Sequence, residues 1–355
     1  MLDRMKATAP SQPVEGALLH WLQAHVTGFE GPARLDKFKG GQSNPTFKLI
    51  AASGTYVLRR QPAGKLLKSA HAVDREFRVI KALAGSGVPV PRVHGLCESR
   101  DVIGSMFYVM EFCDGRIFWD ATLATLDSNE ERGAIYDEMN RVLAALHRVD
   151  PAPVGLDDYG KPGNYFARQL TRWTGQYRAS ELQPIPAMED LMAWLDANQP
   201  PDDGRVALVH GDYRLDNMVF HAHEPRIIAV LDWELSTLGH PLADLAYQCM
   251  QLRMPSDAGA TPGLKGIDRD ALGIPSESEY VARYCERTGI ADIGNWTFYL
   301  AFNFFRLAAI IQGVAKRAVD GNASNTRAAE LGQWVEPLAR MALAAIDEDQ
   351  HIYPA

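Results

Sequence analysis

The feature that most constrains the fold of this chain is a polar segment, His210 to Asn217, that lies between two short apolar runs. The first run, Ala207 to Val209, comes directly before it, and the second, Ile227 to Leu231, ends directly at Asp232. Short apolar runs separated by a polar, turn-rich stretch are typical of buried strands that present a loop. We therefore predict that the two runs form paired strands and that the polar residues lie on a loop.

The polar segment has the spacing H-x-D-x4-N, and an aspartate stands at the end of the next apolar run. Phosphoryl transfer to a hydroxyl needs one carboxylate to orient the attacking oxygen, and a carboxylate and an amide to hold Mg²⁺. Asp212 is therefore the candidate catalytic base, and Asn217 and Asp232 are the candidate metal ligands. We expect His210 and Arg214 to support the base, His210 through a hydrogen bond to the loop or to the region of Asp232.

Composition places the chain among ordinary folded proteins. It has 355 residues, of which 46% are hydrophobic and 23% are charged, which is not the composition of a disordered, collagen-like or coiled-coil chain. At roughly 150 residues per domain, this length suggests two domains or lobes. The 36 basic and 44 acidic residues give a net charge of −8, so we expect no nucleic-acid partner.

Cysteine usage and apolar patterning indicate a cytoplasmic protein without a membrane partner. The four cysteines include no C-x-x-C pair, so neither a disulfide framework nor a zinc cluster is expected. Leu18 and Leu19 stand among polar residues, unlike the apolar stretch of a signal peptide. The most apolar stretch, Phe298 to Ala315, contains Arg306, whose charge would be costly against lipid, so we expect a buried helix there.

The first third of the chain has the pattern of a sheet with one long helix, preceded by an N-terminal helix. Within residues 35–60, the turn-forming sequence Gly40 to Pro45 separates stretches typical of strands, which predicts a hairpin with a glycine loop. From Ala72 to Leu83, apolar residues recur at helical spacing. Met106 to Phe112 is interpreted as a short buried strand, so we place the N-terminal lobe at residues 1–111.

Residues 112–355 are mainly helical in pattern and form the second predicted lobe. Helical spacing recurs in residues 130–149, 165–177, 188–197, 277–288, 296–319 and 328–346. A further helical run, Leu242 to Leu252, follows Asp232 after only about a dozen residues, which leaves no room for the activation segment of a protein kinase. The predicted fold class is α+β, with a small antiparallel-sheet lobe followed by a larger helical lobe.

Motifs in both lobes match one known family. They are His210 to Asn217, Leu231 to Glu234 and Gly239 to Ala246 in the second lobe, and Gly40 to Phe47, Tyr56 to Arg60 and Asp74 to Glu76 in the first. Together they resemble the aminoglycoside phosphotransferase and choline kinase family over roughly residues 30–315. The resemblance implies a two-lobed protein-kinase-like fold with nucleotide in the cleft. Leu58 to Leu67 and Ser69 to Glu76 are most similar to the kinase-like domains fused to acyl-CoA dehydrogenases.

The resemblance also implies a set of nucleotide-binding residues. These are Gly41, Ser43, Asn44, Arg59, Glu76, Met110, Glu111 and Phe112. Arg59 stands where the family has a lysine, so a planar fork replaces a movable ammonium, and Lys48 is the alternative cation. We expect Glu76 to pair with Arg59 and to align it with the phosphates, the alternative being an ordinary surface pair. The backbone of the last three residues is expected to receive the purine.

The predicted activity is ATP- and Mg²⁺-dependent transfer of the γ-phosphoryl group to a hydroxyl of a small molecule. The resemblance favours a hydroxylated metabolite such as a hydroxy-acyl compound, and it favours association with an acyl-CoA dehydrogenase. Arg168 and Arg172 lie on one face of a predicted helix and could bind an anionic group, although a solvated basic face is the alternative. The other candidate substrate-binding residues are Glu234, Tyr177 and Arg306.

Two other functions remain open at this point. An aminoglycoside 3'-type phosphotransferase would need a carboxylate-lined pocket for its polycationic substrate, and acidic clusters at residues 127–131, 157–158 and 202–203 could line one. A non-catalytic nucleotide-binding pseudokinase is disfavoured because Asp212, Asn217 and Asp232 are all present. The patterns decide neither the oligomeric state nor the choice between ATP and GTP.

Overall fold

The computed structural model describes residues 11–38, 44–62, 72–257, 262–320 and 328–352. They pack into two compact units. The first comprises residues up to Trp119 together with 152–156 and 215–236, and the second comprises 120–151, 157–214 and the residues from Thr237 onward. Asn217 and Asp232 therefore belong to the first unit and Asp212 to the second. The predicted lobes, residues 1–111 and 112–355, divide the chain differently from these two units, and the boundary between the lobes stays a prediction.

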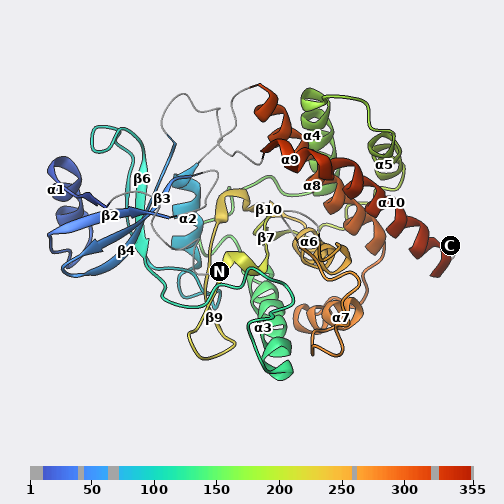
Figure 1. The fold of residues 1–355 in the computed structure, drawn as a ribbon, viewed down its shortest axis with the longest axis horizontal. Helices are drawn as coiled ribbons and strands as arrows, with labels where there is room; N and C mark the ends of the chain where they lie inside the picture. The colour runs from blue at the N-terminus through green and yellow to red at the C-terminus, as the bar shows by residue number, and fades with distance from the viewer. Residues whose placement is uncertain (1–10, 39–43, 63–71, 258–261, 321–327, 353–355) are drawn as a thin grey trace. The chain divides into compact units, whose positions relative to one another are not determined.

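The first unit is built around a six-stranded antiparallel sheet with the strand order β1-β2-β3-β4-β6-β5. The strands are β1 (Gln12–Pro13), β2 (Ala33–Lys37), β3 (Thr46–Ala51), β4 (Gly54–Arg60), β5 (Val93–Cys97) and β6 (Phe107–Glu111). Figure 1 shows β2, β3, β4 and β6 as one layer. The predicted hairpin is confirmed, since β2 and β3 pair with each other, and β4 extends the sheet; residues 39–43 between β2 and β3 lie outside the described residues.

Two helices complete the first unit. Helix α1 (Gly16–His25) buries Leu18 and Leu22, which join a core cluster that includes Leu49 and Phe107 of the sheet. Helix α2 (Val73–Leu83) packs against β5, β6 and the 3₁₀ turn η3 (Trp233–Leu235). Because the apolar residues of α2 recur at helical spacing, one face of the helix is buried, and Glu76 is buried with it while Asp74 and Lys81 are exposed. The predicted helix is thus confirmed.

The predicted pairing of the two apolar runs around the polar segment is wrong. Strand β7 (Ala207–Val209) pairs with β10 (Thr237–Gly239) in the second unit. Strand β9 (Ile227–Val230) pairs instead with β8 (Met218–Phe220), a strand that begins directly after the polar segment. A short connection joins β8 to β9, so this local hairpin closes at lower entropic cost than pairing across the whole polar segment.

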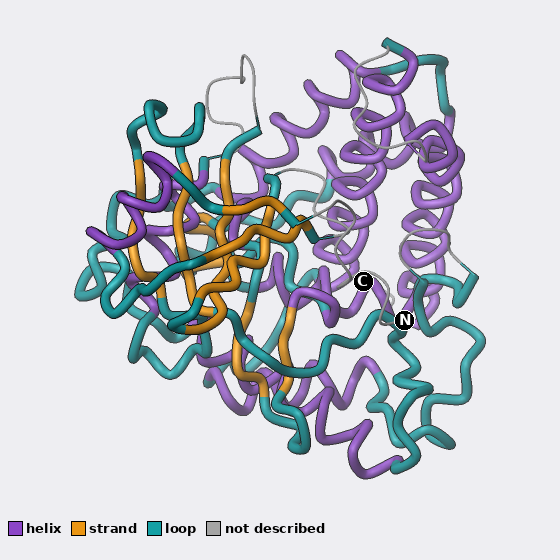
Figure 2. Tube along the Cα trace, turned by 60° about the vertical axis from the view of Figure 1, so that its left-hand side comes forward, coloured by secondary structure: helices purple, strands orange, loops and turns teal. Residues whose placement is uncertain are grey.

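The second unit is mainly helical. Its helices are α3 (Asn129–His147), α4 (Tyr165–Ser180), α5 (Pro186–Ala197), α6 (Leu242–Arg253), α7 (Glu277–Thr288), α8 (Trp296–Val319), α9 (Ala328–Leu331) and α10 (Val335–Ile352). Helix α8 packs against α4, α5, α6 and α10. Figure 2 colours these helices purple and the strands orange. By length and composition α8 could span a membrane, but 72% of its apolar window is buried inside the protein, as predicted.

The last predicted helix, residues 328–346, is wrong as a single element. A 3₁₀ turn, η4 (Gly332–Trp334), separates α9 from α10, and α10 continues to Ile352. At Gly332 the backbone approaches α8 so closely that an added Cβ would lie 2.9 Å from the Cβ of Ala315. The close packing of this glycine against α8 accounts for the break between α9 and α10. The spacing of apolar residues in the sequence does not reveal this contact.

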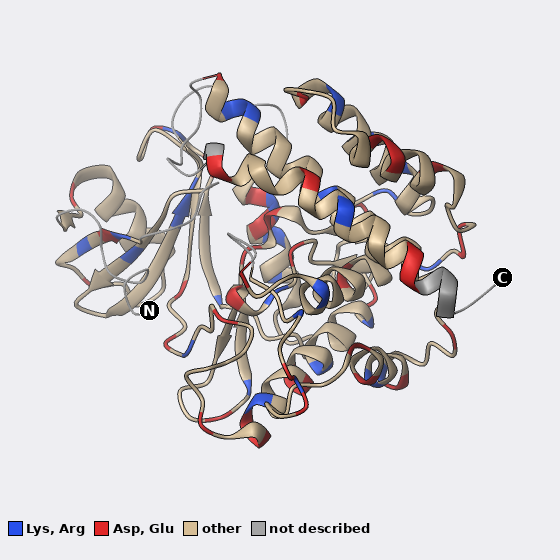
Figure 3. Ribbon diagram, turned by 45° about the vertical axis from the view of Figure 1, so that its right-hand side comes forward, with Lys and Arg blue, Asp and Glu red and all other residues tan. Residues whose placement is uncertain are grey.

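Charges in the second unit are interspersed in sign along the helices, as Figure 3 shows. Many form exposed ion pairs, such as Arg340 with Glu336 at 2.6 Å, and such pairs contribute little to stability. Few charged side chains are buried in the described parts of the chain. The buried arginines and carboxylates there are Arg59, Glu76, Arg132, Asp244 and Arg306. Four of these five lie in the two polar networks described below.

Candidate active site

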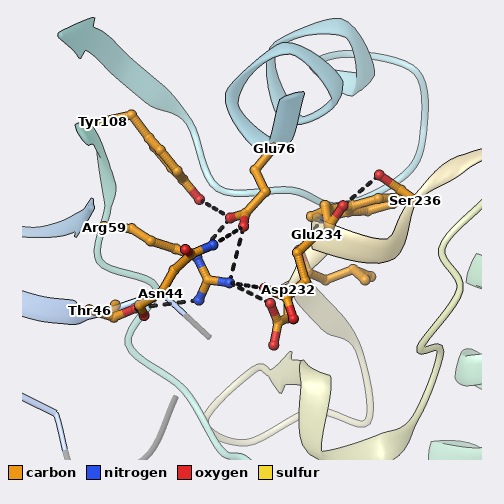
Figure 4. A network of polar contacts seen from close by, with 10 residues as sticks. Asn44, Thr46, Arg59, Glu76, Tyr108, Asp232, Glu234 and Ser236 are labelled. Atoms are coloured by element: carbon orange, nitrogen blue, oxygen red, sulfur yellow. Dashed lines mark hydrogen bonds and ion pairs between the residues drawn. The ribbon is translucent and has the colours of Figure 1, made fainter. Parts of the chain in front are cut away.

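Arg59 and Glu76 form a buried ion pair in the first unit (Figure 4). Arg59 lies near the end of β4 and Glu76 in the first turns of α2, with 8% and 1% of their surfaces exposed. The Nε of Arg59 lies 2.7 Å from Oε2 of Glu76, and its Nη2 donates to Oε1 at 3.2 Å. The predicted pairing is confirmed, and because both side chains are buried, it is not an ordinary surface pair.

Further hydrogen bonds hold the pair in place. Glu76 accepts from Nδ2 of Asn44 at 2.8 Å and from the Tyr108 hydroxyl at 3.0 Å, so both of its carboxylate oxygens are engaged. Arg59 also donates to Oγ1 of Thr46 across the hairpin at 3.3 Å. Asn44 was predicted in the nucleotide loop, and here it braces the ion pair. Its predicted companions Gly41 and Ser43 lie outside the described residues.

Arg59 also reaches Asp232 and Glu234, which belong to the same unit. Its Nη2 donates to Oδ1 of Asp232 at 2.5 Å and lies 3.7 Å from Oε2 of Glu234. Burial works against the charge of Arg59, but Glu76, Asp232 and Glu234 outweigh it and raise the pKa of the guanidinium above its usual value. Burial also disfavours the charge of Glu76 and raises the pKa of this carboxyl, although Arg59 acts in the opposite direction. The fork of Arg59 thus joins α2 to the end of β9.

The same carboxylates have the geometry of a cation site. One oxygen each from Glu76, Asp232 and Glu234 lies within 4.8 Å of the others. Asp232 adopts the left-handed conformation, with φ 65° and ψ 60°, which is uncommon outside glycine and is found at functional sites. Carboxylate and amide oxygens are the ligands that Mg²⁺ prefers. The donor set therefore fits a divalent cation of that kind.

Asn217, the other predicted metal ligand, lies at the same end of the β8–β9 hairpin as Asp232. It ends the 3₁₀ turn η2 (Leu215–Asn217), and its carbonyl oxygen accepts from the backbone N–H of Leu231 at 2.8 Å. The ladder pairs Met218 with Val230, so Asn217 stands opposite the residue that precedes Asp232. The hairpin, rather than the predicted strand pair, brings the two residues together.

The structure also places the alternative cation and the predicted purine-binding residues. Lys48, on β3, stacks its ammonium over the ring of Phe112 at 4.2 Å, so Arg59 and not Lys48 contacts Glu76. Met110 is buried in β6, and the backbone N–H of Glu111 donates to the carbonyl oxygen of Arg92 at 2.8 Å. The role of Met110, Glu111 and Phe112 in binding a purine stays a prediction.

A second network, in the second unit, holds the loop that carries Asp212. Asp244 lies in the first turn of α6 with 1% exposure, and it accepts backbone hydrogen bonds from His210 at 2.6 Å and from Gly211 at 2.8 Å. His147 Nε2 lies 3.3 Å from the same carboxylate. Asp244 thus binds the backbone of the loop. Burial alone would raise the pKa of Asp244, but its contacts with His147 and His210 outweigh this effect and lower it.

Asp212 receives a hydrogen bond from a buried tyrosine. The hydroxyl of Tyr247, one helical turn beyond Asp244 in α6, donates to Oδ1 of Asp212 at 2.6 Å. Burial and the charge of Asp212 raise the pKa of Tyr247, against a smaller opposite effect of Arg214, so the phenol remains a donor. The backbone N–H of Asp212 donates to Nδ1 of His210 at 3.2 Å, which confirms the expected bond from this ring to the loop.

The remaining candidate substrate residues lie on α4 and α8. Arg306 in α8 donates to the carbonyl oxygen of Gly211 at 2.6 Å. Arg168 donates to the carbonyl oxygen of Lys161 at 2.5 Å and braces the loop before α4. Arg172 stacks over Trp173, with 5.2 Å to the ring centroid, and Tyr177 is fully buried. Binding of substrate by these residues stays a prediction.

Sequence reasoning missed two tyrosines. Tyr108 lies in a strand whose residues are nearly all apolar, so nothing in the pattern marks its hydroxyl as the partner of Glu76. Tyr247 stands one turn after Asp244 on α6, and this spacing could have indicated that both side chains meet the loop. Each tyrosine donates a hydrogen bond to a carboxylate that the sequence analysis had singled out, Tyr108 to Glu76 and Tyr247 to Asp212.

Comparisons of the sequence with known proteins give a family and several relatives. The sequence matches the model of the family described as "phosphotransferase enzyme family" over residues 34–280. It is 48% identical to acyl-CoA dehydrogenase family member 10 of Mus musculus, over 96% of this chain and 31% of that protein. It is 44% identical to probable acyl-CoA dehydrogenase IBR3 of Arabidopsis thaliana, over 93% of this chain and 42% of that protein. The chain thus spans less than half the length of these relatives.

Solved structures show the fold. A Ralstonia eutropha protein, provisionally named as an aminoglycoside phosphotransferase, is 50% identical, with a TM-score of 0.86 over 95% of this chain and 99% of that chain. A thermostable mutant of an aminoglycoside phosphotransferase, solved with ADP and hygromycin B, is 15% identical, with a TM-score of 0.58 over 92% of this chain and 97% of that chain. The predicted kinase-like fold is confirmed.

Proposed function

We propose that this chain, which belongs to the phosphotransferase enzyme family, transfers the γ-phosphoryl group of ATP to a hydroxyl of a small molecule. The transfer would use Mg²⁺, and the proposal draws on the two polar networks described above. The observation that carries this proposal is the buried Arg59, joined to both Glu76 and Asp232. A cation fixed between a helix carboxylate and a candidate metal ligand is what nucleotide phosphates require. ADP bound to a neighbour of the same fold supports the choice of ATP.

Asp212 is the proposed catalytic base. Its Oδ1 accepts from Tyr247 at 2.6 Å, and its backbone is fixed through His210. An oriented carboxylate can accept a hydrogen bond from the acceptor hydroxyl and take its proton as the oxygen attacks phosphorus. The hydrogen bond from Tyr247 fixes the carboxylate plane before the acceptor arrives, so less ordering is needed in the transition state.

Arg59 is the proposed ligand of the nucleotide phosphates. A guanidinium fork binds two phosphate oxygens in parallel, which the usual lysine cannot do. Glu76 holds Nε at 2.7 Å and thereby fixes the direction in which the fork points. Nη2 now donates to Asp232, so we expect this nitrogen to turn toward phosphate oxygens when nucleotide binds.

Asn217 and Asp232 are the proposed ligands of Mg²⁺, with Glu234 as a further candidate. When bound, Mg²⁺ would neutralise charge on the transferring phosphoryl group. The left-handed backbone of Asp232 directs its carboxylate to the carboxylate cluster that fits such a cation. Arg59 contacts all three carboxylates of the cluster and balances part of their charge.

The proposed acceptor is a hydroxylated metabolite such as a hydroxy-acyl compound. Relatives named acyl-CoA dehydrogenases carry a region like this chain within a longer protein, which supports related chemistry and an association with such a dehydrogenase. We also propose a cytoplasmic location. The whole chain would then work beside an enzyme that handles acyl thioesters.

A substrate panel tests this proposal. ATP consumption and phosphorylated product would be measured with Mg²⁺ and with excess chelator, using hydroxy acids, their coenzyme A thioesters, choline-like alcohols and aminoglycosides. We expect Mg²⁺-dependent turnover of a hydroxy acid or its thioester. Turnover of aminoglycosides alone would identify an antibiotic kinase instead. Nucleotide binding without transfer to any acceptor would identify a pseudokinase.

A further inference from the structure

Arg306 is a buried charge without a carboxylate partner among the described residues. Only 7% of its surface is exposed, and in the parts of the chain that the structure describes no Asp or Glu forms an ion pair with it. Its guanidinium lies over the rings of Trp173 and Tyr247, at 5.7 and 5.8 Å from their centroids. Removing a charged group from water costs several kcal/mol, so buried arginines are normally paired with carboxylates.

The contacts of Arg306 leave part of its hydrogen-bonding capacity for a ligand. Nη2 donates to the carbonyl oxygen of Gly211 at 2.6 Å, whereas the guanidinium has five N–H donors in all. The two aromatic faces fix the plane of the fork, and each attracts the cation through its π electrons. A planar guanidinium held in one orientation is suited to bind a carboxylate by donating two parallel hydrogen bonds to it.

Arg306 lies beside the proposed base, and every contact that places it there is within the second unit. Gly211, whose carbonyl it binds, directly precedes Asp212 in the chain. Tyr247 contacts both residues, since its hydroxyl donates to Asp212 and its ring packs against Arg306. One tyrosine side chain therefore separates the fork from the carboxylate that would orient the acceptor hydroxyl.

Two more arginines act on the same region. Arg172 stacks over Trp173, the ring that also contacts Arg306. Burial raises the pKa of Tyr165 nearby, and Asp244 acts in the same direction, but Arg306, Arg172 and Arg168 each oppose the rise. All three arginines are therefore close enough to Tyr165 to act on its hydroxyl.

We propose that Arg306 is a specificity residue that binds a carboxylate of the acceptor, while the acceptor hydroxyl lies at Asp212. This inference rests on the proposed function and narrows its substrate class to hydroxy acids. Such an acceptor would supply the missing negative charge beside Arg306. A polycationic aminoglycoside would instead meet an unneutralised guanidinium.

The test compares a hydroxy acid with its neutral amide in the wild type and in Arg306→Gln. The probes are 3-hydroxybutyrate and 3-hydroxybutyramide, and phosphorylation kinetics and calorimetric binding are measured for both. We expect the wild type to prefer the acid, and R306Q to weaken use and binding of the acid about 10- to 100-fold, as loss of charge-assisted hydrogen bonds predicts. The amide should change by less than about threefold. Arg340→Gln, an exposed arginine of α10, is the matched control and should change neither probe.

The outcomes separate this inference from the proposed function. If the wild type phosphorylates no acceptor at all, the proposed function fails, and binding of the two probes still tests the subsite. Equal binding of acid and amide by the wild type, or binding of neither, would overturn the role of Arg306. Equal losses for both probes in R306Q would show that the arginine only braces the loop through Gly211, and would also overturn it.

Discussion

Replacing Asp244 with asparagine probes how the loop that carries Asp212 is held. Asp244 is 1% exposed, and it accepts the backbone N–H groups of His210 at 2.6 Å and Gly211 at 2.8 Å. The amide of D244N keeps one acceptor oxygen but points a donor toward the second N–H. The substitution preserves the shape of the side chain while it removes the charge and one acceptor.

The expected loss follows from these two bonds. A hydrogen bond to a charged group contributes about 1.5–3 kcal/mol, and a buried donor left without a partner costs about 1–3 kcal/mol. D244N loses one bond and weakens the other, so the free energy of unfolding should fall by about 3–5 kcal/mol. Because Gly211 precedes Asp212, displacement of the loop should also lower kcat by about 10²-fold.

Urea unfolding and amide hydrogen exchange measure this effect. We expect faster exchange at the amides of His210 and Gly211, while Asp190→Asn, an exposed aspartate on α5, should change stability by less than about 0.5 kcal/mol. A loss below about 1 kcal/mol in D244N, with both amides still protected, would refute the reasoning.

The same substitution has a predicted pH dependence. Because the pKa of Asp244 is lowered in the folded protein, its carboxylate contributes full stability above the ordinary aspartate pKa of about 3.9. That contribution is lost as the pH falls from there through the lower folded value. The stability difference between wild type and D244N should therefore shrink below about pH 4, and a difference that instead grows on acidification would contradict the account.

Two further predictions concern stability. Replacing one member of the buried pair, as Arg59→Met or Glu76→Leu, should lower the free energy of unfolding by about 3–5 kcal/mol, because the partner charge stays buried. The double variant should lose much less than the sum, and additive losses in urea unfolding would show that the two are not coupled. A Cβ on Gly115 would lie 2.2 Å from the backbone oxygen of Phe220, so Gly115→Ala should destabilise by about 1–3 kcal/mol. Gly175→Ala, on the exposed face of α4 with open space around it, should raise the free energy of unfolding by about 0.5–1 kcal/mol. In thermal unfolding, the midpoint should therefore fall in Gly115→Ala and rise in Gly175→Ala.

Helices were well predicted because their signals are local. Helix α7 begins after Ser276, which forms a capping box with Glu279, and ends at Gly289 in the left-handed conformation. Its predicted range is the observed one. Strand partners were less visible, because the apolar pattern of the runs at 207–209 and 227–231 does not show which strand each one pairs with.

The candidate site shows the same limit. Asp212, Asn217 and Asp232 could be predicted because their residue types and their spacing are visible in the sequence. The hydrogen bonds from Tyr108 to Glu76 and from Tyr247 to Asp212 depend on tertiary packing, and a buried tyrosine looks like any core aromatic in the sequence. Arg306 lies between these cases, since its need for a partner was predictable and the identity of that partner, Gly211, was not.

The measurement that tests the central claim most directly is phosphoryl transfer by Asp212→Asn. The initial rate from labelled ATP would be measured with the acceptor that the wild type uses best, beside the Kd for ATP. The account predicts that kcat falls by about 10²- to 10⁴-fold, the usual contribution of a general base, while the Kd for ATP changes by less than about threefold. An unchanged kcat in D212N would contradict the proposed mechanism.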